Sequence, residues 1–245
     1  MTFLGNDEEL VRIAAGFDDA KSSVLKFGRN QSMSTGVREE IWDGTGVYPY
    51  PATADITHIK AVASGDEGLN IEIQGLDINY ALVVQTKALD GADSSTLVAL
   101  DTPLLRVFRK DIDDSTNAVN NIQCLNAAGS VVYSQISTPF NQTLMALYTV
   151  PAGVTAYLTR YYCQINKKTN AAIEVEVYVR PFGKVFQLKH NGVIASGGDA
   201  HWDFNYLPTS PPLKIEEKSD IKITGLASAA GVDCSAGFDL ILIDN

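Results

Sequence analysis

The stretch LYTVPAGVTAYLTRYYCQI, residues 147–165, indicates the fold class of this 245-residue chain. β-branched and aromatic residues crowd both sides of Pro151-Ala152-Gly153. Proline presets φ for the second position of a turn and glycine suits its last, so this corner predicts two strands folded back on each other as a hairpin. Strict alternation divides the second strand into two apolar faces, one with Tyr157, Tyr161 and Cys163 and the other with Leu158 and Tyr162.

Short runs of strand-forming residues, separated by turn residues, continue along the chain. Ile173–Arg180 alternates strictly, which predicts that its isoleucine and valines face a core while Tyr178 and the glutamates face outward. Asp90-Gly91 is typical of a hairpin turn. Other predicted strands cover residues 71–74, 80–88, 104–109, 131–136, 186–190, 202–206, 221–224 and 238–243. Antiparallel strands with almost no helix between them predict a mainly β protein, an antiparallel β-sandwich of jelly-roll type.

The first 45 residues differ from the rest. Asn6 followed by Glu9 resembles a helix cap with its box partner, and Gly16 would end the helix. A helix this short is marginal in water, so its apolar face needs a partner, either the chain's own β body or a neighbouring subunit reached by an extended arm. Residues 17–46 predict an irregular connection. The apolar side of the helix, a possible docking arm, carries Leu10, Val11 and Ile13.

Length and loop composition suggest three parts. We expect a short N-terminal helical or extended arm at residues 1–45, a first β unit at 46–140 and a second, jelly-roll-like β unit at 141–245.

Composition narrows the function classes. Lys and Arg number 19 against 29 Asp and Glu, a net charge of -10, which argues against nucleic-acid binding because phosphates need a basic face. No apolar run has the length of a membrane span, and the N-terminus lacks the basic region of a signal peptide, so we expect no membrane partner and synthesis in a cytoplasm. Cys124, Cys163 and Cys234 lie in apolar, strand-like surroundings and are expected to be buried free thiols.

Candidate chemistry is sparse. His190 and His201 lie on either side of Gly197-Gly198, where strand pairing could bring them together as two metal ligands, but no third ligand accompanies them. Acidic clusters match no calcium loop, and no spacing singles out a glycosidase pair. Nucleophile and phosphate-binding motifs are absent from the sequence. We therefore expect no enzymatic activity, no catalytic residue, no metal site and no cofactor.

Aromatic residues are better candidates for a binding surface than the residues considered above. On an outer face they could form a glycan platform or a subunit interface, although core packing is the ordinary role of any one of them. The candidates for such a contact are Tyr178, Trp202 and Tyr206.

Six short motifs follow one another along the chain. They are Phe27-Gly28-Arg29-Asn30, Ile41-Trp42-Asp43-Gly44, Ile73-Gln74-Gly75-Leu76-Asp77, Tyr148–Gly153 with Thr155–Leu158, Arg180-Pro181-Phe182-Gly183, and Ala236–Asn245. In this order they resemble a family of virion structural proteins of tailed phages that infect marine bacteria. The similarity spans nearly the whole chain from about residue 27.

This resemblance implies a non-enzymatic particle protein, and it favours a capsid decoration (cement) protein on the head surface of a tailed phage, made in the bacterial host cytoplasm. Its partners would be the major capsid protein or other virion proteins, and jelly-roll decoration proteins commonly form homo-oligomers, with a trimer favoured here. One alternative is a head-fibre or tail component that binds host-surface glycans. Another is a hydrolytic appendage with an acidic pair in a groove.

Overall fold

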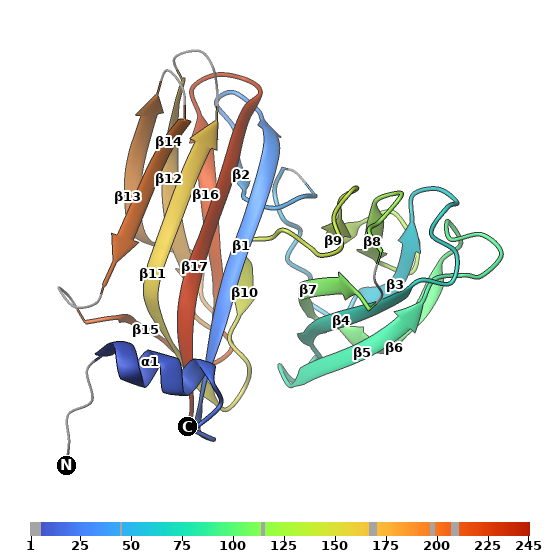
Figure 1. Ribbon diagram of the computed structural model, residues 1–245, viewed down its shortest axis with the longest axis horizontal. Helices are drawn as coiled ribbons and strands as arrows, with labels where there is room; N and C mark the ends of the chain where they lie inside the picture. Colours follow the sequence, from blue (N-terminus) through green and yellow to red (C-terminus); the bar gives the residue numbers. More distant parts are fainter. Residues whose placement is uncertain (1–5, 45, 114–115, 167–170, 197–198, 207–210) are drawn as a thin grey trace.

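A computed structural model describes residues 6–44, 46–113, 116–166, 171–196, 199–206 and 211–245. All strand pairings between its named strands are antiparallel, and the fold is mainly β with one short helix, as the sequence predicts. The strands form two bodies, a larger one that includes both the first and the last strand of the chain and a smaller one built from the middle (Figure 1).

The larger body, here called the sandwich unit, consists of two five-stranded sheets that share one hydrophobic core. Its first sheet holds β1 (Lys21–Met33), β17 (Val232–Asp244), β11 (Val154–Asn166), β14 (Asp199–Asn205) and β15 (Leu213–Ile215). Its second sheet holds β10 (Leu147–Thr149), β16 (Asp220–Ala227), β12 (Ala171–Arg180), β13 (Gln187–Ser196) and β2 (Arg38–Glu40). This arrangement is a β-sandwich.

The core of the sandwich unit follows directly from alternation in its strands. In β12, Ile173, Val175, Val177 and Val179 are all buried, as the period of two predicts. In β17, even-numbered residues from Val232 to Leu242 face the same core from the opposite sheet. Two apolar faces are thus covered by one another, which removes most of their surface from water.

The smaller body, here called the small unit, has its own hydrophobic core. One sheet holds β6 (Val98–Leu104), β3 (Ile56–Ala61), β8 (Ile122–Leu125) and β9 (Val132–Ile136). The other holds β5 (Leu82–Ala88), β4 (Asn70–Leu76) and β7 (Arg106–Ile112). The strands on either side of Asp90-Gly91 do not form a hairpin, because β5 pairs with β4 and β6 pairs with β3.

The prediction of an irregular connection over residues 17–46 is wrong. β1 runs antiparallel to β17 with Lys21 opposite Ile243, so the larger unit draws strands from both ends of the described chain. Its alternation is inverted in the middle: Lys26, Gly28 and Asn30 are buried, while Leu25 and Phe27 are exposed. The sequence conceals this strand because, before Met33, its buried positions are polar or lack a side chain.

The predicted hairpin at Pro151-Ala152-Gly153 is also wrong. β10 pairs with β16 in the second sheet, whereas β11 pairs with β17, β14 and β15 in the first. The corner therefore carries the chain from one sheet of the sandwich to the other.

The predicted faces of β11 are corrected by a β-bulge. The register against β17 shifts between Leu158 and Arg160, and one extra residue reverses the alternation there. Leu158 and Tyr161 are both buried, while Tyr157 and Tyr162 are partly exposed. The strand is thus buried on one face only.

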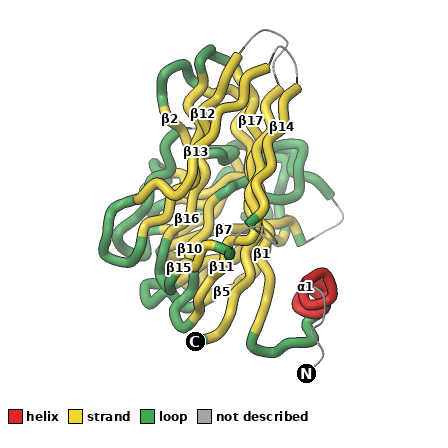
Figure 2. Tube along the Cα trace, turned by 90° about the vertical axis from the view of Figure 1, so that its left-hand side faces the viewer, coloured by secondary structure: helices red, strands yellow, loops and turns green. Residues whose placement is uncertain are grey.

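The predicted N-terminal helix exists as α1 (Asn6–Ala14). Figure 2 shows it beside β1, on the side of that sheet facing away from the second sheet. Ile13 is 5% exposed, whereas Leu10 and Val11 are exposed. The chain's own β body therefore covers only part of the apolar side of α1.

Candidate functional site: a basic cleft between the units

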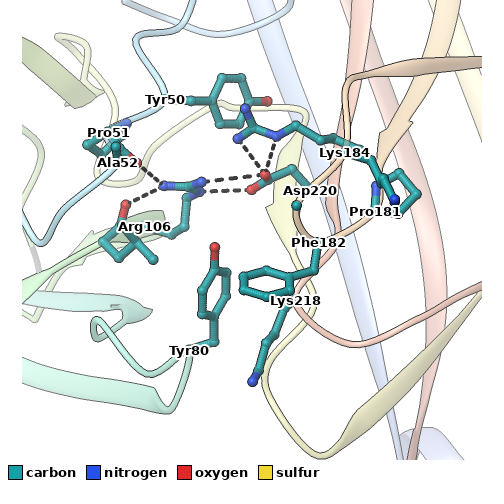
Figure 3. A pocket seen from close by; sticks show the side chains of 13 residues that line it. Tyr50, Pro51, Ala52, Tyr80, Arg106, Pro181, Phe182, Lys184, Lys218 and Asp220 are labelled. Carbon is teal, nitrogen blue, oxygen red and sulfur yellow. Dashed lines mark hydrogen bonds and ion pairs between the residues drawn. The ribbon is translucent and has the colours of Figure 1, made fainter.

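A cleft with a cavity volume of about 230 Å³ opens where the small unit meets the sandwich unit. We call it the interunit cleft (Figure 3). Two turns of the sandwich unit and one edge of the small unit enclose it. Its walls are Tyr50, Pro51, Ala52, Tyr80, Leu105, Arg106, Arg180, Pro181, Phe182, Gly183, Lys184, Lys218 and Asp220.

An ion cluster across the two units forms the back wall of the cleft. Arg106 begins β7 of the small unit, and its Nε donates to Asp220 Oδ1 on β16 over 2.8 Å. Arg180, at the end of β12, donates from Nε to Asp220 Oδ2 over 2.8 Å. Thr149 Oγ1 donates to Asp220 Oδ1 over 2.6 Å. One carboxylate therefore neutralises one of two guanidinium charges, and the cluster keeps a net positive charge.

Arg106 is held in one orientation. Its Nη1 also donates to the carbonyl oxygens of Pro51 over 2.7 Å and Leu105 over 2.8 Å. Burial lowers the pKa of Arg106, but the hydrogen bond and charge of Asp220 outweigh burial and leave that pKa above its ordinary value. The guanidinium is thus a fixed, permanently charged part of the wall.

An aromatic layer lies beside these cations. The guanidinium carbon of Arg180 lies 4.6 Å from the ring centroids of both Tyr50 and Phe186. Lys222 Nζ lies 4.3 Å from the centroid of Phe186. Such stacking favours the charged form of the cations and fixes their positions. Burial raises the pKa of Tyr50, so its hydroxyl stays protonated.

Two cleft residues have unusual backbone conformations. Tyr80 has φ of 65° and Lys218 has φ of 59°, and they are the two non-glycine residues with positive φ in the described ranges. Such conformations cost energy and persist where surrounding contacts impose them. Here the sheet-switching corner supplies those contacts: Ala152 N donates to Tyr80 O, and Lys218 N donates to Val150 O, each over 2.9 Å.

These strained residues form the mouth of the cleft with Phe182. The rings of Tyr80 and Phe182 meet edge to face, with centroids 5.7 Å apart, and Lys218 Nζ lies 5.5 Å from the centroid of Phe182. Phe182 is 61% exposed. The mouth therefore presents an aromatic surface and ammonium groups to solvent.

A second surface feature is apolar and lies on the first sheet. We call it the apolar arm surface. Its residues are large, exposed and located on α1, on the loop after it and on β1: Leu10, Val11, Phe17, Leu25 and Phe27. Large apolar side chains that gather on one surface mark a contact with another molecule, so these five residues are the candidate for such a contact.

The structure places Tyr178 and Tyr206, two of the three predicted contact residues, on different sheets of the sandwich unit. Tyr178 lies on the outer face of β12, where its hydroxyl donates to Glu176 Oε2 over 2.6 Å. Tyr206 follows β14 in the other sheet and packs against the sandwich core, with its ring 5.0 Å from that of Phe204. Trp202 lies opposite Cys163 in β14, and its side chain is outside the described residues.

The histidine pair of the sequence prediction is not joined by strand pairing. His190 lies in β13, which pairs with β12, and His201 lies in β14, which pairs with β11. Within the described ranges, no group of three His, Cys, Asp or Glu residues could hold a metal ion. No helix in those ranges is long and apolar enough to cross a membrane.

Sequence reasoning missed the interunit cleft because its residues come from distant segments. One local signal existed: Arg180-Pro181-Phe182-Gly183 and the corner after Tyr148 are among the motifs of the family resemblance, and both adjoin the cleft.

No family model and no curated protein matches this chain. Among solved structures, it is similar to a chain from infectious bursal disease virus, Gt strain, with 11% identity and a TM-score of 0.24 over 92% of this chain and 73% of that one. It is also similar to the VP2 subviral particle of infectious bursal disease virus, with 12% identity and a TM-score of 0.22 over 93% of this chain and 74% of that one. Likenesses of this size do not establish a shared fold.

Proposed function

We propose that this protein is a non-enzymatic structural protein of a virion, and specifically a capsid decoration protein that binds the head shell of a tailed phage as a homo-oligomer. The apolar arm surface is the observation that carries this proposal. Val11 is 66% exposed, Phe17 is 72% exposed and Leu25 is 69% exposed, although each could be buried at a protein contact.

The construction of this surface favours a docking role. The helix α1 is nine residues long and too short to be stable alone, while Ile13 is its one buried apolar anchor among Leu10, Val11 and Ile13. A partner that covers Leu10 and Val11 would complete the burial of the helix. We assign that partner as a shell subunit because the ordered motifs of the chain resemble virion structural proteins.

A triple variant tests this proposal. Leu10, Val11 and Phe17 are changed together to Ser, and copies per particle are counted by quantitative mass spectrometry after the protein is added to particles that lack it. Each large apolar side chain contributes about 1.5 kcal/mol or more when buried, so affinity for the particle should fall at least about tenfold.

Val193→Ser is the matched control, because Val193 is 68% exposed on β13 of the other sheet. It should leave occupancy unchanged. Undiminished occupancy of the triple variant, or equal losses in both proteins, would overturn the proposed docking surface.

A further inference from the structure

We propose that the interunit cleft binds a carboxylate-bearing sugar unit of an acidic polysaccharide. This inference goes beyond the proposed virion role, and it rests on residues separate from the apolar arm surface. Three properties of the cleft support it: the sign of its charge, the aromatic residues at its mouth and its preformed shape.

Charge identifies the ligand as an anion. The side chains of Arg106, Arg180, Lys184 and Lys218 carry positive charge, and Asp220 is the one acidic residue of the lining. This local excess of cations occurs in a chain with a net charge of -10. A ligand carboxylate at the mouth would meet donors that are charged at neutral pH, which is the strong class of hydrogen bond.

The aromatic mouth distinguishes a sugar from a simple ion. The ring of Phe182 is exposed and is fixed edge to face against Tyr80. A pyranose ring has an apolar C–H face that packs on such a surface, while its carboxylate remains free to reach Lys218 or Arg180. An acidic side chain of a peptide would use the cations but would leave the aromatic face of Phe182 without a matching group.

The size of the cleft fits one sugar ring. Its volume of about 230 Å³ equals the liquid volume of about eight water molecules. A single carboxylated monosaccharide unit occupies most of such a space, and the open mouth allows the rest of a polysaccharide to extend into solvent.

The cleft is preformed. Arg106 is fixed by Asp220 and by two carbonyl oxygens, and the corner at Ala152 holds Tyr80 and Lys218 in conformations that their residue types rarely adopt. A site that is already ordered loses little conformational entropy on binding. Backbone strain in two residues of one cleft is also typical of a functional site.

Titration with a glucuronic-acid oligosaccharide, followed by NMR shifts of cleft amides, tests the proposal. The wild-type protein should bind with a dissociation constant of about 1 mM or less, the affinity expected for a ligand of this size. A neutral glucose oligosaccharide of equal length should bind at least about tenfold more weakly, because it lacks the carboxylate.

Two variants assign the binding to the cleft. Lys218→Asn removes the ammonium with a residue that tolerates positive φ, and Phe182→Ala removes the exposed ring. Each should weaken binding of the acidic oligosaccharide at least about tenfold. Lys189→Asn and Val193→Ala are matched controls on exposed positions of β13 and should bind like the wild type.

Three outcomes would overturn the proposal: no binding of the acidic oligosaccharide, equal binding of the neutral one, or equal loss in the variants and their controls. A poly-glutamate peptide is titrated in parallel. If the peptide binds with the same dependence on Lys218 and Phe182 while the oligosaccharide does not, the cleft recognises an acidic protein segment and the sugar assignment is wrong.

Discussion

The sandwich unit and the small unit are both antiparallel β bodies, but their interiors differ in polarity. In the sandwich core, the free thiols of Cys163 and Cys234 lie 3.4 Å apart among apolar side chains. In the small unit, Lys110 is fully buried, and its Nζ donates to the carbonyl oxygens of Ile122 over 2.8 Å and Ser134 over 3.3 Å. The centre of the small unit thus encloses an ammonium group, whereas the buried carboxylates of the sandwich unit include Glu39 and Glu40 on β2 and Glu176 on the outer face of β12.

Lys110 shows what it costs to fill part of a small β core with a charged side chain. The aliphatic stem of Lys110 fills interior space, and backbone carbonyls satisfy its ammonium, but removal of the charge from water costs free energy. The contact between the two units is polar as well: Arg106 pairs with Asp220, and Lys26 of β1 donates to the carbonyl oxygen of Phe108. Buried cations thus lie inside the small unit and along its contact with the sandwich unit.

The largest expected effect comes from the ionic contact between the units. Asp220→Asn would leave Arg106 and Arg180 without their shared carboxylate, and loss of one partner from a buried pair typically costs about 3–5 kcal/mol. Denaturant unfolding measures this loss. Asp203→Asn is the control, because Asp203 pairs with the more exposed Arg160, and it should cost about 1 kcal/mol or less. Equal effects would show that the contact does not depend on the buried charges.

A smaller expected effect is the pH dependence of stability that buried Lys110 gives to the small unit. Burial lowers the pKa of Lys110 from 10.5 to about 8. Between these values the unfolded chain binds a proton that the folded chain does not, so the free energy of unfolding should rise with pH from about 8 to 10.5. The rise from this group is at most about 3 kcal/mol.

Lys110→Met should remove the part of the rise that Lys110 contributes and increase stability at neutral pH, because the buried charge is gone. A second rise remains in this variant, because burial lowers the pKa of Lys26 to about 7. Urea unfolding at about pH 7, 8, 9 and 10 gives the slope of the free energy of unfolding against pH across the predicted rise. Lys60→Met, on the half-buried face of β3, should keep the slope of the wild type. A slope in Lys110→Met as steep as that of the wild type would show that Lys110 does not contribute to the rise.

The smallest expected effect concerns local opening. Burial raises the pKa of Cys124, and the contact with Cys163 raises the pKa of Cys234, so all three thiols should resist labelling in the native protein. Cys124 of the small unit should nevertheless label at least about tenfold faster than the sandwich thiols, because the smaller core opens more readily. Pulse labelling with mass spectrometry measures the rates. Faster labelling of Cys163 or Cys234 would reverse the comparison.

The sequence was informative where side chains face a single apolar core. Strict alternation predicted β12 correctly because both of its neighbours are strands of one sheet and its inner face meets only the sandwich core. The buried free thiols were predicted for the same reason, and the structure confirms them. Sequence periodicity reports one side of a strand well when that side meets uniform surroundings.

The sequence pattern gave a wrong prediction for β1, where the strand crosses closely over other backbone segments. In β1, a Cβ on Gly28 would lie 2.3 Å from both Ala146 N and Ile41 O, so only glycine fits this crossing. Lys26 and Asn30 are buried beside it because they bond to other segments: Asn30 Nδ2 donates to Glu39 Oε2 over 2.8 Å. When the buried residues of a strand are polar and bond to other segments, its sequence lacks apolar alternation and looks like that of a loop.

The candidate site could not be predicted for a different reason. Tyr80, Arg106, Phe182 and Lys218 are distant in sequence, and the contact between units that gathers them leaves no local periodicity. The corner at Pro151 was recognised as a turn, but the choice between a hairpin and a change of sheet depends on strands far along the chain. The β-bulge in β11 was not predicted either, because it lies in the pairing with the distant strand β17.

The pairing of β1 with β17 sets an order of events during synthesis. Lys21 leaves the ribosome long before its partner Ile243 is added to the chain. Until then Leu25 and Phe27 lie on a strand without its neighbour, and unpaired strands with apolar residues are prone to wrong association. Closing so long a loop also costs chain entropy, which slows the pairing of the two strands. The nascent chain should therefore need protection of this segment, by a chaperone or by early docking of its apolar residues, before the first sheet can be completed.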